Sequence, residues 1–195
     1  WIATADGSRN TQYTRGNFSA SAPAFSPDSE HLSFISKRGE GDSTKSQVWI
    51  MPLFGGEARQ LSDAENNVGA FKWSPTGDRI AFSMQDPFSE EREREIEEKR
   101  DVILVDQQPR YSHLHVVPMS DSSSKSSKSV QITAGELVVG DFSWSPDGGE
   151  IAFSHKPTAD LNVANQHGDI SIVTVPSSSA IIAASSNNGP DLEKP

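Results

Sequence analysis

Apolar and polar positions along the chain repeat in a unit of fixed spacing. In each copy an aromatic residue is followed by a Ser-Pro turn, and a phenylalanine lies nine residues after that aromatic residue. The three pairs are Phe25 with Phe34, Trp73 with Phe82, and Trp144 with Phe153. A glutamine that stands two residues before Thr or Ser lies 13 residues upstream of each aromatic residue, at Gln12, Gln60 and Gln131. Three copies that share two spacings establish an internal repeat.

Each copy of the repeat predicts four short strands. The Ser-Pro-Asp-Gly sequence suits a type I turn between the first two strands, with Gly in the fourth position. The first copy has Ser29 where the other copies have Gly77 and Gly148, so we expect a strained turn there. A third strand is expected at residues 48–51, 114–117 and 172–175, each followed by a proline: Pro52, Pro118 and Pro176. The Gln-x-Thr/Ser segment supplies the fourth strand.

Repeated four-stranded antiparallel units predict an all-β fold built from β-propeller blades. Residues 1–4 match the third strand in register, so a half blade at 1–14 is expected before the blades at 18–62 and 66–133. A partial blade at 138–176 follows, and residues 177–195 are expected to form a Ser/Asn-rich tail or inter-strand loop. Because a propeller needs about four to eight blades, we expect an incomplete ring and interpret the chain, which starts at Trp1, as a fragment.

A charged insertion interrupts the middle blade at residues 86–111. Residues 90–100 are strong helix formers with acid-first i,i+4 pairs at Glu90/Arg94 and Glu95/Lys99, and residues 86–89 can start a helix. Residues 101–106 are expected to return as an extra strand, and the Ser/Lys tract at 121–129 as a surface loop. Two interpretations of the helix stay open. In the first, the helix is a solvent-exposed excursion from the blade. In the second, the carboxylates of Glu90, Glu91 and Glu93 face a channel and attract a cationic group such as a peptide amino terminus.

Composition and charge exclude several classes of partner. Hydrophobic residues make up 34% of the chain, and no run approaches the roughly 18 apolar residues of a membrane span. A net charge of −10 argues against a nucleic-acid partner. The absence of cysteine removes disulfides, thiol catalysis and cysteine-ligated zinc, and it fits a reducing, cytoplasmic location.

Candidate chemistry within these residues is sparse. A serine-hydrolase elbow needs Gly-x-Ser-x-Gly, and its nearest approach, around Ser43, lacks the second glycine. His113 and His115 would share one face of a strand as two metal ligands do, but no third ligand lies at a suitable spacing. Trp73 and Trp144 are interpreted as packing residues. The sequence therefore predicts no catalytic residue, no metal and no cofactor.

The repeats resemble a known class of propeller. Residues 73–82 and 144–153 are similar to the WD-like repeat of TolB-type propellers. Residues 36–39, 47–51, the Glu-rich segment and residues 105–111 together resemble the amino-terminal propeller of the prolyl-oligopeptidase family. The resemblance is to its acylaminoacyl-peptidase and dipeptidyl-peptidase-like branch, and it covers about residues 1–175.

This resemblance implies a function for the whole polypeptide. In that family a serine peptidase domain of α/β-hydrolase fold follows the propeller in the same chain. The propeller caps the active site, so it excludes folded proteins and admits short peptides. The family's catalytic triad matches no position here, so the parent enzyme would be a serine peptidase whose catalytic residues lie elsewhere. The alternative is a non-enzymatic TolB-like propeller that binds proteins through its rim or channel. A sugar- or ester-active propeller enzyme is a third possibility, which the spacings do not support.

Overall fold

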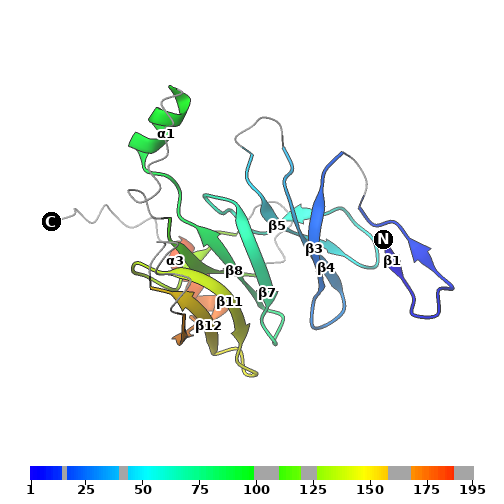
Figure 1. Ribbon diagram of the computed structural model, residues 1–195. Coiled ribbons are helices and arrows are strands. Elements are labelled where there is room, and N and C mark those ends of the chain that lie inside the picture. The colour runs from blue at the N-terminus through cyan, green and yellow to red at the C-terminus, as the bar shows by residue number, and fades with distance from the viewer. Residues whose placement is uncertain (15–16, 40–43, 99–109, 120–126, 158–167, 187–195) are drawn as a thin grey trace.

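The computed structural model describes residues 1–14, 17–39, 44–98, 110–119, 127–157 and 168–186. Its strands follow one another as antiparallel blades that fan out from β1 to β12 (Figure 1). The half blade contains β1 (Ile2–Ala3) and β2 (Asn10–Thr11). The first complete blade contains β3 (Ala20–Phe25), β4 (His31–Ser36), β5 (Gln47–Pro52) and β6 (Arg59–Gln60), paired in that order.

The second complete blade and the partial blade share one sheet of seven strands. The second blade contains β7 (Val68–Trp73), β8 (Arg79–Gln85), β9 (Ser112–Pro118) and β10 (Val130–Gln131). The partial blade contains β11 (Val138–Trp144), β12 (Glu150–Lys156) and β13 (Asp169–Thr174). A single parallel pair, Ser112 with Val138, joins β9 to β11. The predicted fold class, an all-β fragment made of antiparallel blades, is confirmed.

The Ser-Pro turns have the geometry that their sequence predicts. In each turn the N–H of the fourth residue donates to the carbonyl oxygen of the serine, at 2.9 to 3.0 Å. The fourth residue is in the left-handed region, with φ of +61° at Ser29 and +73° at both Gly77 and Gly148. This conformation favours glycine, so the strain expected at Ser29 is confirmed.

The repeated Gln-x-Ser/Thr sequence has a structural role. The side-chain Nε2 of Gln12, Gln60 and Gln131 donates to the carbonyl oxygen two residues further on, at 3.0, 2.8 and 2.7 Å. The hydroxyls of Ser62 and Thr133 accept the backbone N–H of Val48 and Leu114 in the third strand, at 2.9 and 3.0 Å. These bonds hold a two-residue fourth strand on the edge of its blade.

Neighbouring blades pack on each other through apolar side chains. Val48, Ile50 and Leu61 of the first complete blade are buried against β7 and β8, and Leu114 and Val116 of the second are buried against β11 and β12. The indole N–H of each turn tryptophan reaches the preceding blade, from Trp73 to Ser33 Oγ at 2.8 Å and from Trp144 to the Lys72 carbonyl at 3.1 Å. Both tryptophans therefore pack between blades, as expected.

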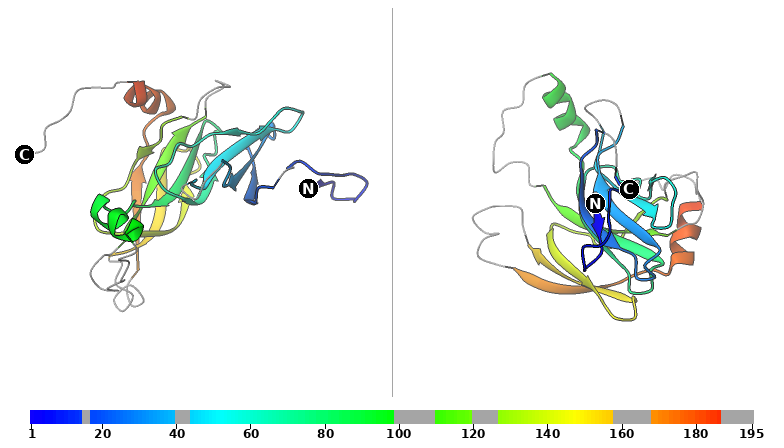
Figure 2. Two further views of the ribbon diagram at one scale, coloured as in Figure 1. Left: turned by 90° about the horizontal axis from the view of Figure 1, so that it is seen from above. Right: turned by 90° about the vertical axis from the view of Figure 1, so that its right-hand side faces the viewer.

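The charged insertion forms helix α1 (Glu90–Glu97), and Ser89 is its N-cap. The extra strand expected at residues 101–106 lies outside the described residues, as does most of the Ser/Lys tract. Helix α1 lies on a different side of the blades from helix α3 (Ser178–Ser186) (Figure 2). No helix among the described residues is long and apolar enough to cross a membrane.

The end of the last blade differs from the sequence prediction in two ways. First, β13 ends at Thr174 rather than directly before Pro176. Val175 follows β13 directly: its N–H still donates to the Gly149 carbonyl at 2.9 Å, and its side chain is buried in the core between the blades. Second, the region expected to be a tail or loop contains α3, in which Ile181 is 1% exposed in the same core.

Candidate functional site

Helix α1 presents the three glutamates that the sequence singled out. Glu90, Glu91 and Glu93 lie in its first turn and are exposed. Ser89 Oγ accepts the N–H of Arg92 at 3.3 Å. Carboxylates near a helix N-terminus are stabilised by the unpaired N–H groups there, so this acidic turn is compatible with the helix and leaves its charge available to solvent.

The other charged residues of α1 pair differently from the prediction. Arg94 Nε donates to the backbone carbonyl of Glu90 at 3.2 Å. The ion pair in the described part of the helix is i,i+3, between Arg92 Nη1 and Glu95 Oε2 at 2.8 Å. Arg92 is buried. The predicted pair of Glu95 with Lys99 falls outside the described residues.

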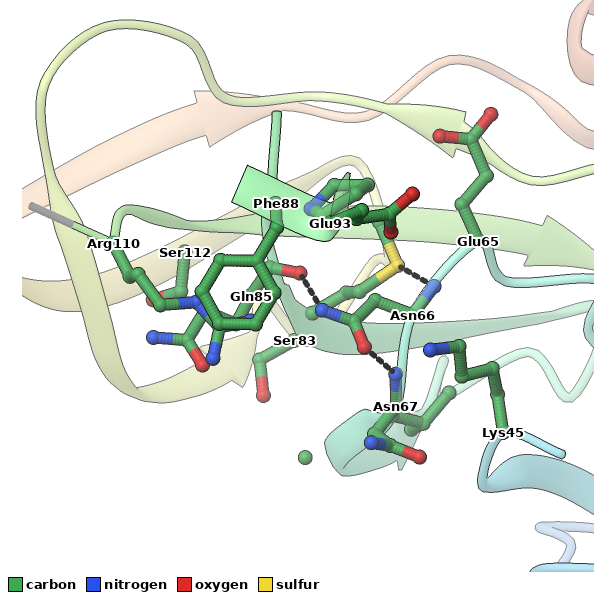
Figure 3. A pocket seen from close by; sticks show the side chains of 14 residues that line it. Lys45, Glu65, Asn66, Asn67, Ser83, Gln85, Phe88, Glu93, Arg110 and Ser112 are labelled. Carbon is green, nitrogen blue, oxygen red and sulfur yellow. Dashed lines mark hydrogen bonds between the residues drawn. The ribbon is translucent and has the colours of Figure 1, made fainter. Parts of the chain in front are cut away.

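A pocket of about 500 Å³ lies at the foot of α1, where β7 and β9 begin and β8 ends. Figure 3 shows Arg110, Ser112 and Gln85 on one side of it and Glu65, Asn66, Asn67 and Lys45 on the other, with Phe88 and Glu93 between the two groups. The structure therefore brings Glu93 to the pocket. Glu90 and Glu91 do not line it, and Glu91 lies instead along a depression on the helix with Arg94, Glu95 and Glu98.

The wall at Asn66 is held by a set of hydrogen bonds. The Asn66 Nδ2 donates to the carbonyls of Gln85 and Asp86, at 3.1 and 3.3 Å, and its Oδ1 accepts the N–H of Asn67 at 2.8 Å. Asn66 is buried. Its side chain thus fixes the start of β7 to the end of β8, so this wall is set before any ligand arrives.

Arg110 provides a cation on the opposite wall. Its guanidinium lies 4.1 Å from the centre of the Phe88 ring, and its Nη2 donates to the Asp86 carbonyl at 3.2 Å. Burial lowers the pKa of Arg110, and the Asp86 carboxylate opposes that change. An arginine stays charged in proteins. Its Nε is buried and has no hydrogen-bond partner among the residues that the structure describes.

The pocket therefore combines two cations, Lys45 and Arg110, with two carboxylates, Glu65 and Glu93. Such a site can hold a ligand that carries both charges, as a short peptide does at its termini. Sequence reasoning found Glu93 and missed the other three. Phe88 and Arg110 lie near the two ends of the charged insertion at residues 86–111. That position was the available signal, since insertions in a repeat usually map to one functional face.

The other candidates that the sequence raised are a serine and two histidines, and both histidines contact neighbouring side chains. Ser43 lies outside the described residues. His113 Nδ1 is 3.3 Å from Thr133 Oγ1, and its Nε2 is 3.5 Å from Asp86 Oδ2. His115 stacks on Phe82, and burial together with the neighbouring His113 lowers its pKa to about 4. Within the described ranges, the group with three metal-ligating side chains in reach of one another is Asp28, Glu30 and His31 in the β3–β4 turn. There, Asp28 already accepts bonds from Ser26 and the Glu30 N–H.

Comparison with known proteins finds one curated relative, which is a peptidase. The chain is 29% identical over 181 residues to an uncharacterised peptidase, YuxL, of Bacillus subtilis (strain 168), covering 86% of this chain and 26% of that protein. The chain thus spans about a quarter of this curated relative. No family model matches the chain.

Solved structures show the same fold at low sequence identity. An acylaminoacyl peptidase of Pyrococcus horikoshii matches 78% of this chain and 23% of its own, with a TM-score of 0.50 and 17% identity. A prolyl endopeptidase structure matches 85% of this chain and 22% of its own, with a TM-score of 0.51 and 16% identity. The resemblance predicted from the sequence, to a propeller of prolyl-oligopeptidase-family peptidases, is confirmed.

Proposed function

We propose that this chain is the non-catalytic propeller portion of a serine peptidase of the prolyl-oligopeptidase family. Its 29% identity to a peptidase over 86% of its length supports this assignment, and the blade architecture agrees with it. The parent polypeptide supplies the α/β-hydrolase domain that carries the catalytic triad. The propeller restricts access to that domain, so short peptides reach the active site and folded proteins do not.

The observation that carries the gating proposal is the acidic first turn of α1 above a pocket of mixed charge. The carboxylates of Glu90 and Glu91 create a negative electrostatic potential near the pocket, and Glu93 and Arg110 both line it. A negative field attracts a peptide with a free amino terminus and raises its rate of encounter. Arg110 can receive the carboxylate of the same peptide in a charge-assisted bond.

The test uses the natural full-length protein with the triple variant E90Q/E91Q/E93Q. Its kcat/KM is measured on two peptides that differ only in acetylation of the amino terminus. We expect about a threefold to tenfold loss for the free peptide, and little change for the acetylated one, because steering acts on the charged ligand. Raising the salt concentration is expected to reduce the difference between the two peptides.

A matched control variant separates local from general electrostatics. Glu30, Glu57 and Glu150 are exposed glutamates near the opposite ends of the strands from α1. The variant E30Q/E57Q/E150Q changes the net charge equally and is expected to leave both peptides unaffected. Equal losses in the two variants, or no loss in either, would reject the gate at α1. Absence of any peptidase activity in the wild-type full-length protein would favour a non-enzymatic interaction propeller instead.

A further inference from the structure

A second pocket, of about 410 Å³, lies at the junction of the first and second complete blades, and we call it the junction pocket. Its lining comes from residues 63–65, which follow β6, from Met84 in β8, from His115 in β9, and from residues 128–131 around β10. It shares Glu65 and Met84 with the pocket at the foot of α1. The peptide-gating proposal assigns no role to its other lining residues.

His115 gives the junction pocket a buried polar group. Its side chain is 7% exposed, and its Nε2 has no hydrogen-bond partner among the residues that the structure describes. Most buried polar atoms in proteins do have such a partner. The ring stacks on Phe82 with 5.4 Å between the ring centres, and burial together with His113 lowers the pKa of His115 to about 4. At pH 7 His115 is therefore a neutral, well-positioned group that a ligand can satisfy.

The acidic part of the junction pocket is fixed to the first blade. Asp63 and Glu65 flank Ala64, and both are exposed. The buried side chain of Gln47 holds Ala64 from both directions, because its Nε2 donates to the Ala64 carbonyl and its Oε1 accepts the Ala64 N–H, each at 2.9 Å. The backbone that carries the two carboxylates is thus set before any ligand arrives.

This combination of groups favours an extended cation. In the part of the chain that the structure describes, Asp28, Glu30 and His31 are the residues whose ligand atoms lie close enough together to share one metal ion. The acceptors of the junction pocket do not meet that condition, so they suit a cation larger than a metal ion. A guanidinium spreads five N–H donors over a plane and is weakly hydrated. Buried Met84 and Ala64 provide apolar surface for its faces and for the methylene stem of an arginine.

We propose that the junction pocket binds a guanidinium group, with Asp63 and Glu65 as its charge partners and His115 as a hydrogen-bond partner. The arginine side chain of a peptide and a free guanidinium compound carry the same chemistry. Lys128 also lines the pocket, and as a cation it competes with the ligand. The proposal goes beyond the proposed function and does not depend on it, because binding here needs neither a catalytic domain nor a charged peptide terminus.

Calorimetric titration of the natural full-length protein tests the proposal. The two probes are N-acetyl-arginine methylamide and N-acetyl-citrulline methylamide, which have similar shape and differ in charge. Both have blocked ends, so neither offers the terminal charges on which the gating proposal depends. We expect the arginine compound to bind about tenfold more tightly, with a smaller difference at high salt. Equal affinities, or binding of neither probe, would overturn the proposal.

A third probe, butylguanidine, identifies the source of the group. Both of its possible results support the site. If butylguanidine binds as tightly as the arginine compound, the pocket recognises the guanidinium alone and a free compound is its ligand. If the arginine compound binds more tightly, the peptide backbone contributes and the ligand is an arginine within a peptide.

Variants with opposite expected effects add a second readout. Asp63→Asn is expected to weaken binding of the arginine compound severalfold, and Lys128→Met to strengthen it, because the first removes a charge partner and the second a competitor. His115→Phe keeps an aromatic ring beside Phe82 and is expected to weaken binding. Asp169→Asn is the matched control, since Asp169 is an exposed aspartate of β13 that does not line the pocket. Equal weakening by Asp63→Asn and Asp169→Asn, or weakening by Lys128→Met, would show that the proposal is wrong.

Discussion

The first Ser-Pro turn should become more stable when Ser29 is replaced by glycine. Ser29 has φ of +61°, while glycine occupies the equivalent position in the other two turns at φ of +73°. The left-handed conformation costs a residue with a Cβ about 1–2 kcal/mol. Glycine loses about 0.5–1 kcal/mol more backbone entropy on folding. The difference leaves Ser29→Gly about 0.5–1 kcal/mol more stable than wild type.

Urea unfolding followed by circular dichroism measures this change, together with a thermal midpoint expected to rise by about 1–4 °C. Exposed Ser19, whose φ is negative, provides the matched control, and Ser19→Gly is expected to lose stability. The reverse change, Gly77→Ala, is expected to destabilise through backbone strain, since its Cβ would meet Pro27 at an ordinary contact distance of 3.5 Å. If Ser29→Gly were as destabilising as Ser19→Gly, the strain assigned to this turn would be refuted.

Three further predictions concern single substitutions in the strands and turns. The folded-state pKa of His115, about 4, lies below its ordinary value of 6.5, so the unfolded chain binds more protons between those values. Stability should fall as pH drops through this range, by about 2 kcal/mol at pH 5. His115→Phe should remove that part of the pH dependence in urea unfolding at pH 5 and 8, and an unchanged dependence would contradict it. Arg79→Met should lose about 2–3 kcal/mol, because Arg79 is buried and donates to the carbonyls of Gly148 and Pro176, at 3.0 and 2.6 Å; an unchanged midpoint would contradict this role. Gly140→Ala should cost about 1–3 kcal/mol in the same assay, because its Cβ would lie 2.7 Å from Ser154 Oγ. Restored stability in G140A/S154A would confirm that contact.

Much of the fold could be predicted because the repeat encodes local chemistry. The turn at Ser74–Gly77 and the bond from Gln60 to the Ser62 carbonyl depend on residues within a few positions of one another. The start of α1 at Ser89 is local in the same way. Such features recur wherever their sequence recurs, so three copies were enough to place the strands.

The parts that were missed depend on contacts between distant residues. Helix α3 forms where Ile181 can enter the core between blades, and the Pro176 carbonyl bonds Arg79, 97 positions away in the sequence. The pocket likewise needs Arg110 and Asn66 brought together by the fold. A repeat pattern gives the strands but not which side chains meet at the ends of neighbouring strands.

The most direct test of the account is to read the natural coding sequence on both sides of these 195 residues. The account predicts further four-stranded repeats, and a Gly-x-Ser-x-Gly elbow followed by an aspartate and then a histidine in the order of an α/β-hydrolase triad. A reading frame that holds the repeats and no such hydrolase domain would contradict the peptidase assignment, and the propeller would then be a binding module.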